Sequence, residues 1–183
     1  MADGREVLAL DLRQLPSDSE LSRPVAEALA IAASVVLDRV HGQQDGYPAE
    51  IHGDENMRAA LLRCVPIGDA ERATYGDSQE ATEEGGEGVA IAVARRALGR
   101  IVFRRLPKGT GADYLMRDPA SASDDSYERL ECSAIADGQE SPSARLGKKL
   151  DQLARFPAHP PGKAVVTSFR ERPVEVRYGS WSK

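Results

Sequence analysis

Two acidic residues followed by a basic segment are the side chains of this chain best placed to do chemistry. Asp113 comes after the turn G-T-G and opens a short apolar run, while Glu131 lies inside the next apolar run. A basic segment follows, with Arg145, Lys148, Lys149 and Gln152. Two carboxylates on adjacent strands can hold one divalent cation such as Mg²⁺, and a nearby lysine can steady a water or a phosphate during hydrolysis. The two acids and the basic segment therefore predict a metal-dependent hydrolytic site.

The run that carries Glu131 has the alternation of a strand with one apolar face. Successive side chains of a strand point to opposite faces, so Leu130 and Cys132 should meet the core while Glu131 and Ser133 share the other face. The glycines before Asp113 permit a tight turn and a close approach of the backbone to a ligand. If the two runs pair as a hairpin, both carboxylates converge.

The basic segment should be a helix over residues 143–156, capped by Ser143. Its buried stripe, at spacing i, i+4, i+7, consists of Leu146, Leu150 and Leu153. Arg145, Lys149 and Gln152 form the adjoining stripe and can face the rim of the sheet. The alternative for Lys149 is a structural role, in which its aliphatic stem covers apolar surface and its charge stays in water.

The remaining pattern predicts an α/β (α+β) fold with a mixed sheet. Helices are expected over 23–41 and 78–98, and the second carries a stripe of small residues, namely Ala81, Gly85, Gly88 and Ala92. Glycine inside a helix costs about 1 kcal/mol, so this stripe should face protein. Strands at 100–106, 112–116 and 127–135 should form an antiparallel meander flanked by helices, and 163–169 should join the same sheet.

Other segments are assigned more briefly. Further short strands are expected at 6–12, 49–52 and 174–178, and 57–65 fits either a helix or a strand. The polar stretches at 69–76 and 117–126 are expected to be connections.

Length and composition indicate one domain over residues 1–183. The chain has 41% hydrophobic and 29% charged residues, which is ordinary for a globular protein with one core. Aromatic residues make up only 5%, which disfavours a fold built on base-stacking platforms. Cys64 and Cys132 are far apart in apolar surroundings and are expected to be buried thiols. No apolar run is long enough to span a membrane, so we expect a cytoplasmic protein with no membrane partner.

The charge is distributed unevenly along the chain. Residues 1–98 hold 9 basic and 18 acidic residues, whereas residues 99–183 hold 15 and 11. The predicted site lies in the basic half, which is compatible with a polyanionic substrate such as nucleic acid. An acidic solvated surface without a nucleic-acid role is equally compatible. A protein partner or an oligomer also stays open.

The order helix, three-stranded meander, helix and strand resembles the PD-(D/E)XK nuclease superfamily, which has a restriction-endonuclease-like fold. The resemblance covers about residues 77–178 and leaves 1–76 as an N-terminal extension. It implies that Asp113 and Glu131 bind Mg²⁺, and that Glu84 or Glu80 matches the helix glutamate that some members add as a metal ligand. The chain also resembles a bacterial family with the motifs K-G-T-G-x-D-Y and R-L-E-x-S-x-I.

The chain departs from the superfamily at one position. Ser133 stands where the motif E-x-K has its lysine, and serine carries no positive charge. Some members move this lysine to the following helix, so Lys149 is the expected substitute, with Gln152 as a polar group that orients it. The resemblance thus implies a divergent Mg²⁺-dependent nuclease that hydrolyses phosphodiesters. The alternatives are a catalytically inactive, nuclease-like adaptor or partner subunit and, third, a metabolic enzyme on another α/β fold.

Overall fold

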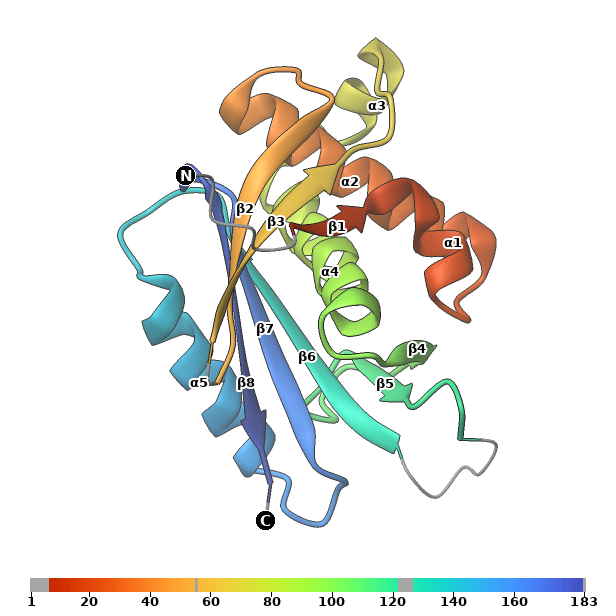
Figure 1. The fold of residues 1–183 in the computed structure, drawn as a ribbon, viewed down its shortest axis with the longest axis vertical. Helices are drawn as coiled ribbons and strands as arrows, with labels where there is room; N and C mark the ends of the chain where they lie inside the picture. The colour runs from red at the N-terminus through yellow and green to blue at the C-terminus, as the bar shows by residue number, and fades with distance from the viewer. Residues whose placement is uncertain (1–6, 55, 122–126, 183) are drawn as a thin grey trace.

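The computed structural model describes residues 7–54, 56–121 and 127–182. Within these residues, eight strands form one mixed sheet in the order β1-β3-β2-β8-β7-β6-β5-β4, with helices packed on both faces (Figure 1). The predicted α/β class with a mixed sheet is therefore confirmed. The strands are β1 (Leu8–Asp11), β2 (Gly46–His52), β3 (Met57–Arg63), β4 (Ile101–Arg105), β5 (Tyr114–Arg117), β6 (Tyr127–Ile135), β7 (Gly162–Ser168) and β8 (Val174–Trp181). The helices are η1 (Leu12–Gln14), α1 (Leu15–Asp18), α2 (Arg23–His41), α3 (Asp69–Thr74), α4 (Ser78–Arg96) and α5 (Pro142–Ala154).

The half of the sheet that carries the candidate acids is built as predicted. Strands β4, β5 and β6 form an antiparallel meander. Helix α5 then crosses over, and β7 pairs with β6 in parallel. Strand β8 returns antiparallel to β7 and pairs in parallel with β2, which joins the two halves of the sheet.

The small-residue stripe of α4 packs against α2, as predicted. A Cβ at Gly88 would lie 2.7 Å from the backbone oxygen of Leu29, and one at Gly85 would lie 3.0 Å from Cα of Ala33. The next position, Gly86, faces Ala134 of β6 instead. Glycine is therefore required here because the backbones of two helices and a strand approach closely.

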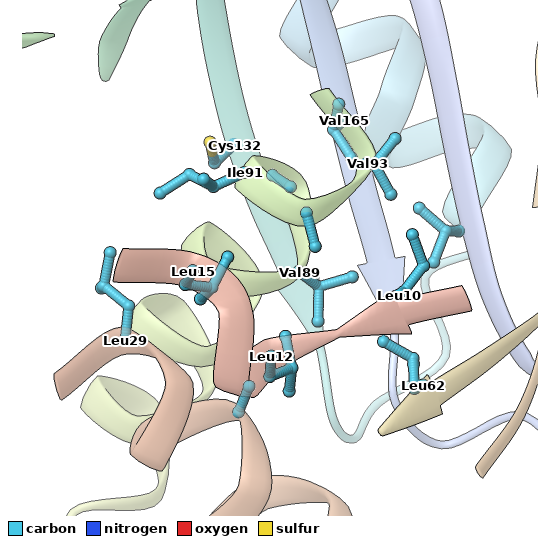
Figure 2. Close-up of a cluster of buried hydrophobic side chains, with 14 of the residues drawn as sticks. Leu10, Leu12, Leu15, Leu29, Leu62, Val89, Ile91, Val93, Cys132 and Val165 are labelled. Atoms are coloured by element: carbon cyan, nitrogen blue, oxygen red, sulfur yellow. The ribbon is translucent and has the colours of Figure 1, made fainter. Parts of the chain in front are cut away.

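The main core lies between α4 and the sheet, and α2 covers α4 from outside (Figure 1). Figure 2 shows Cys132 of β6 beside Ile91 of α4, with Val165 of β7 nearby. A smaller apolar cluster on the opposite face of the sheet holds α5 through its buried Leu153. The two faces of β6 therefore differ as alternation requires: Cys132 faces the core, and its neighbours in the sequence face α5.

Several local assignments differ from the sequence expectation. Residues 69–74, expected to be a connection, form the short helix α3, whereas 57–63 form a strand, which was one of the two alternatives for 57–65. Glu71 supplies the reason, because its carboxylate accepts a hydrogen bond from the Gly68 N–H and caps this helix. Helix α5 is capped by Ser141 rather than Ser143, with Pro142 in the first turn.

Parts of two predicted segments, residue 6 and residues 122–126, lie outside the described residues. Among the helices of the described chain, none is both long and apolar enough to cross a membrane.

Candidate functional site

Asp113 and Glu131 lie next to each other at the junction of β5 and β6. The β5–β6 pairing ends at Tyr114 and Leu130, and Asp113 and Glu131 are the next residues of the two segments, close enough for the charge of Asp113 to raise the pKa of Glu131. The Asp113 N–H donates to the Leu130 carbonyl at 3.0 Å, and its Oδ2 accepts from the Cys132 N–H at 2.7 Å. The Asp113 side chain thus continues the ladder where β5 ends and is held against the edge of β6.

Glu131 is almost completely enclosed and is paired with Lys149. The glutamate is 2% exposed, and its Oε1 accepts a hydrogen bond from Lys149 Nζ at 2.6 Å. The same Nζ lies 3.3 Å from Oε1 of Gln152. The structure therefore brings together the four residues that the sequence singled out. The other carboxylate oxygen of Glu131, Oε2, is buried and has no hydrogen-bond partner in the described part of the chain.

Burial makes both acids weaker than usual. Desolvation, and then the charge of Asp113, raises the pKa of Glu131 to about 7, although Lys149 and Gln152 act in the opposite direction. Desolvation also raises the pKa of Asp113, against the Cys132 N–H and the positive charge of Lys149. Two interacting carboxylates in a poorly solvated site thus disfavour carrying two negative charges, and a divalent cation would offset those charges.

The turn before Asp113 is shaped by its glycines. Gly109 and Gly111 have φ angles of 91° and 79°, in the left-handed region that other residues rarely adopt. A Cβ at position 111 would lie 2.2 Å from the ring of Phe156, just beyond α5. The turn can therefore pack under the end of α5 only because residue 111 is glycine, and this packing delivers Asp113 to β6.

A cleft of about 610 Å³ opens beside the pair, where β6 runs on beyond β5. Its walls are the first half of α4, the exposed edge of β6 and the first half of α5. The residues that line it are Ser78, Gln79, Thr82, Glu83, Glu87, Asp113, Cys132, Ser133, Ala134, Ile135, Ala136, Asp137, Arg145 and Lys149. The lining is mostly polar and charged, as is suitable for a charged ligand rather than an apolar one.

Helix α4 contributes Glu83 and Glu87 to the cleft, and Glu87 is the more buried of the two. The carboxylate of Glu87 accepts a hydrogen bond from the Tyr114 hydroxyl and pairs with Arg105 at 3.2 Å. Desolvation raises the pKa of Glu87, which is mostly buried. Glu84, expected as the helix glutamate of the site, instead accepts a hydrogen bond from the Tyr75 hydroxyl at 3.1 Å and does not line the cleft. Glu80 is exposed and does not line the cleft either.

The sequence analysis did not single out Glu87 as a residue of the site. The available signal was its position between Gly86 and Gly88. Glycines on both sides of a helix residue indicate close packing at that level, and a glutamate there is poorly placed to be fully solvated.

The described residues contain no group of three or more His, Cys, Asp or Glu side chains that could hold a metal ion. Mg²⁺, however, is commonly bound through one or two carboxylates together with waters. Asp113 and Glu131 meet that requirement, and the unpartnered Oε2 of Glu131 is an oxygen with spare coordinating capacity. The residues present therefore fit a Mg²⁺ ion with an incomplete protein shell.

Comparisons with known proteins give little further guidance. No protein-family model matches the chain. A UDP-N-acetylmuramate–L-alanine ligase from Salinispora arenicola (strain CNS-205) is 36% identical over 95 residues, which is 52% of this chain. The matched part is only 16% of that ligase. No solved structure matches.

Proposed function

We propose that this chain is a divergent PD-(D/E)XK nuclease that hydrolyses phosphodiesters with Mg²⁺. The observation that carries the proposal is the cluster of Asp113, Glu131 and Lys149, in which Asp113 and Lys149 line a polar cleft and the buried Glu131 pairs with Lys149 behind them. The order α4, β4–β5–β6, α5 and β7, with β6 and β7 parallel, supports it, because this is the arrangement of elements that the resemblance implies.

The residues have distinct roles in this proposal. Asp113 and Glu131 would hold Mg²⁺, which when bound lowers the pKa of a water and neutralises charge on the phosphate. Lys149 contributes a positive charge that stabilises the negative charge developing on the phosphate. Gln152 orients the lysine through its side-chain oxygen, 3.3 Å from Nζ. Hydrolysis then needs only positioning and electrostatic stabilisation from the protein.

In this proposal, Lys149 replaces the lysine that the motif E-x-K has at the position of Ser133. Helix α5 packs on the face of the sheet that carries Glu131, so a lysine on its inner stripe reaches the same carboxylate. Lys149 is 23% exposed, so its ammonium group stays close to the water in the cleft while bound to Glu131.

The decisive experiment combines metal binding with a cleavage assay. We expect isothermal titration to show Mn²⁺ binding, and incubation with Mn²⁺ or Mg²⁺ to cleave DNA or RNA. Asp113→Asn should remove both while the far-ultraviolet circular dichroism stays unchanged. Asp54→Asn, which removes a carboxylate that does not line the cleft, serves as the matched control. The proposal is contradicted if the unmutated protein shows no Mn²⁺ binding and no cleavage of DNA or RNA.

The second candidate is a catalytically inactive, nuclease-like adaptor or partner subunit. It is favoured by the direct pairing of Glu131 with Lys149, which already neutralises one of only two candidate ligands. Under this alternative the chain folds normally and binds no Mn²⁺. For both candidates we propose a cytoplasmic location, where the two free cysteines, Cys64 and Cys132, would stay reduced.

A further inference from the structure

Arg145 lies in the same cleft as Lys149, one helical turn earlier on α5. Its Nε donates to Glu140 Oε2 at 2.5 Å, and its Nη1 donates to Ser133 Oγ at 3.2 Å. Its Nη2 has no partner among the residues that the structure describes. A guanidinium has five N–H donors, so Arg145 is held in place and still has donors to offer a ligand.

Glu140, the acidic partner of Arg145, also pairs with a second cation. Glu140 is shared between two cations, since its Oε1 pairs with Lys148 Nζ at 2.7 Å. The backbone oxygen of Glu140 accepts a hydrogen bond from Arg170 Nη2 at 2.9 Å, which fixes the loop that carries this acid. One carboxylate therefore serves both Arg145 and Lys148, so the positive charge of Arg145 is only partly offset by Glu140, while Asp137 is a further acid that lines the cleft.

The opposite wall of the cleft has the opposite character. Helix α4 contributes Glu83 and Glu87 there. A phosphate next to the one being cleaved is repelled by these acids and attracted by Arg145. The charges of the two walls thus determine on which side an extended substrate would lie.

We propose that Arg145 binds the phosphate adjacent to the scissile phosphate, an inference that rests on the proposed nuclease function. Positions 145 and 149 are separated by about 6 Å along the helix axis, a distance that neighbouring phosphates of one nucleic-acid strand can span. The hydroxyl of Ser133 then has a use of its own, because it orients the Arg145 guanidinium at the position where a lysine is missing. The substrate is therefore a nucleic-acid strand with at least two consecutive phosphates, rather than a compound with a single phosphodiester.

Equilibrium binding of short thymidine ligands tests the inference. The ligands are a dinucleotide with only its internal phosphate and the same dinucleotide with an added 5′- or 3′-phosphate, measured with Ca²⁺, a cation that takes the same oxygen ligands. For the unmutated protein, we expect one of the added phosphates to strengthen binding about tenfold, as charge-assisted hydrogen bonds to phosphate do. Arg145→Gln should remove this gain, and Arg145→Lys should retain part of it, because lysine keeps the charge but loses the planar fork.

The matched control is Arg155→Gln, which removes a guanidinium from the other end of the same helix. Arg155 is exposed, and the Arg155→Gln variant should keep the full gain in binding from the added phosphate. The inference is overturned if the gain persists in Arg145→Gln, if Arg155→Gln loses it equally, or if no ligand binds. If the protein cleaves DNA or RNA but Arg145→Gln does not change the gain in binding, the nuclease function stands and only this subsite is contradicted. If the gain in binding depends on Arg145 but no nucleic acid is cleaved, the phosphate subsite stands and the nuclease function is contradicted.

Discussion

Glu131 is the residue whose protonation most directly links the candidate site to stability and metal binding. Its pKa is raised from 4.5 to about 7, chiefly by burial. Below pH 4.5 the carboxyl group is protonated in both the folded and the unfolded chain, so its burial has no charge-related cost. Between pH 4.5 and 7 the unfolded chain releases the proton and the folded chain keeps it, so this contribution to stability is lost as pH rises.

We therefore expect Glu131→Gln to gain stability relative to the unmutated protein as pH rises. The difference between the two proteins in the free energy of unfolding should increase by roughly 3 kcal/mol from pH 4.5 to 8. Urea denaturation at several pH values measures it. The affinity of the unmutated protein for Mn²⁺ should increase over the same range, since a cation needs the ionised carboxylate. A difference that does not change with pH would show that Glu131 titrates normally in the folded protein.

Lys149 is expected to stabilise the fold as well as to act on a substrate. Lys149→Met removes the cation that partners the buried Glu131, and breaking a buried ion pair in this way costs about 3–5 kcal/mol. Lys148→Met is the matched control, because its side chain is 72% exposed and pairs only with Glu140 at the surface. Its effect should be less than about 1 kcal/mol. Thermal unfolding at pH 8 compares the two variants, and equal effects would contradict a buried ion pair.

At the scale of elements, two helical glycines should respond oppositely to the same substitution. Gly88→Ala places a Cβ 2.7 Å from the Leu29 oxygen and should destabilise the protein by about 1–3 kcal/mol. Gly147→Ala on α5 meets no atom within 4 Å and should stabilise it by about 0.5–1 kcal/mol, since alanine is the better helix former. Chemical denaturation measures both variants. A stabilising Gly88→Ala would mean that α2 and α4 do not pack closely.

At the scale of the whole molecule, residues 1–76 complete the fold that carries the site. Strand β2 pairs with β8 in the interior of the sheet, and α2 covers the glycine stripe of α4. A fragment of residues 77–183 alone would expose the edge of β8 that pairs with β2 and the glycine stripe of α4 that α2 covers. We expect this fragment to lack a cooperative thermal transition, and residues 1–76 supplied as a separate chain to restore it. A fragment that unfolds cooperatively near the transition temperature of the full chain would show that the first 76 residues are accessory.

The sequence by itself predicted the elements whose patterns are local. The alternation in 127–135 located β6 and its two faces, and the spacing of small residues in α4 predicted close packing. Asp113, Glu131, Lys149 and Gln152 could be selected because strand alternation and helix periodicity determine which side chains share a face. Short segments such as α3 were missed, since a single capping carboxylate decides them.

Only the tertiary structure decided how distant segments meet. It brought Glu83 and Glu87 rather than Glu84 to the cleft, because the rotation of α4 about its axis is set by the contacts of Gly85 and Gly88 with α2. It also paired Lys149 with Glu131 and set Arg145 beside Ser133. These distances depend on how α5 lies on the sheet, and that placement is determined by packing among residues far apart in the chain rather than by any local pattern.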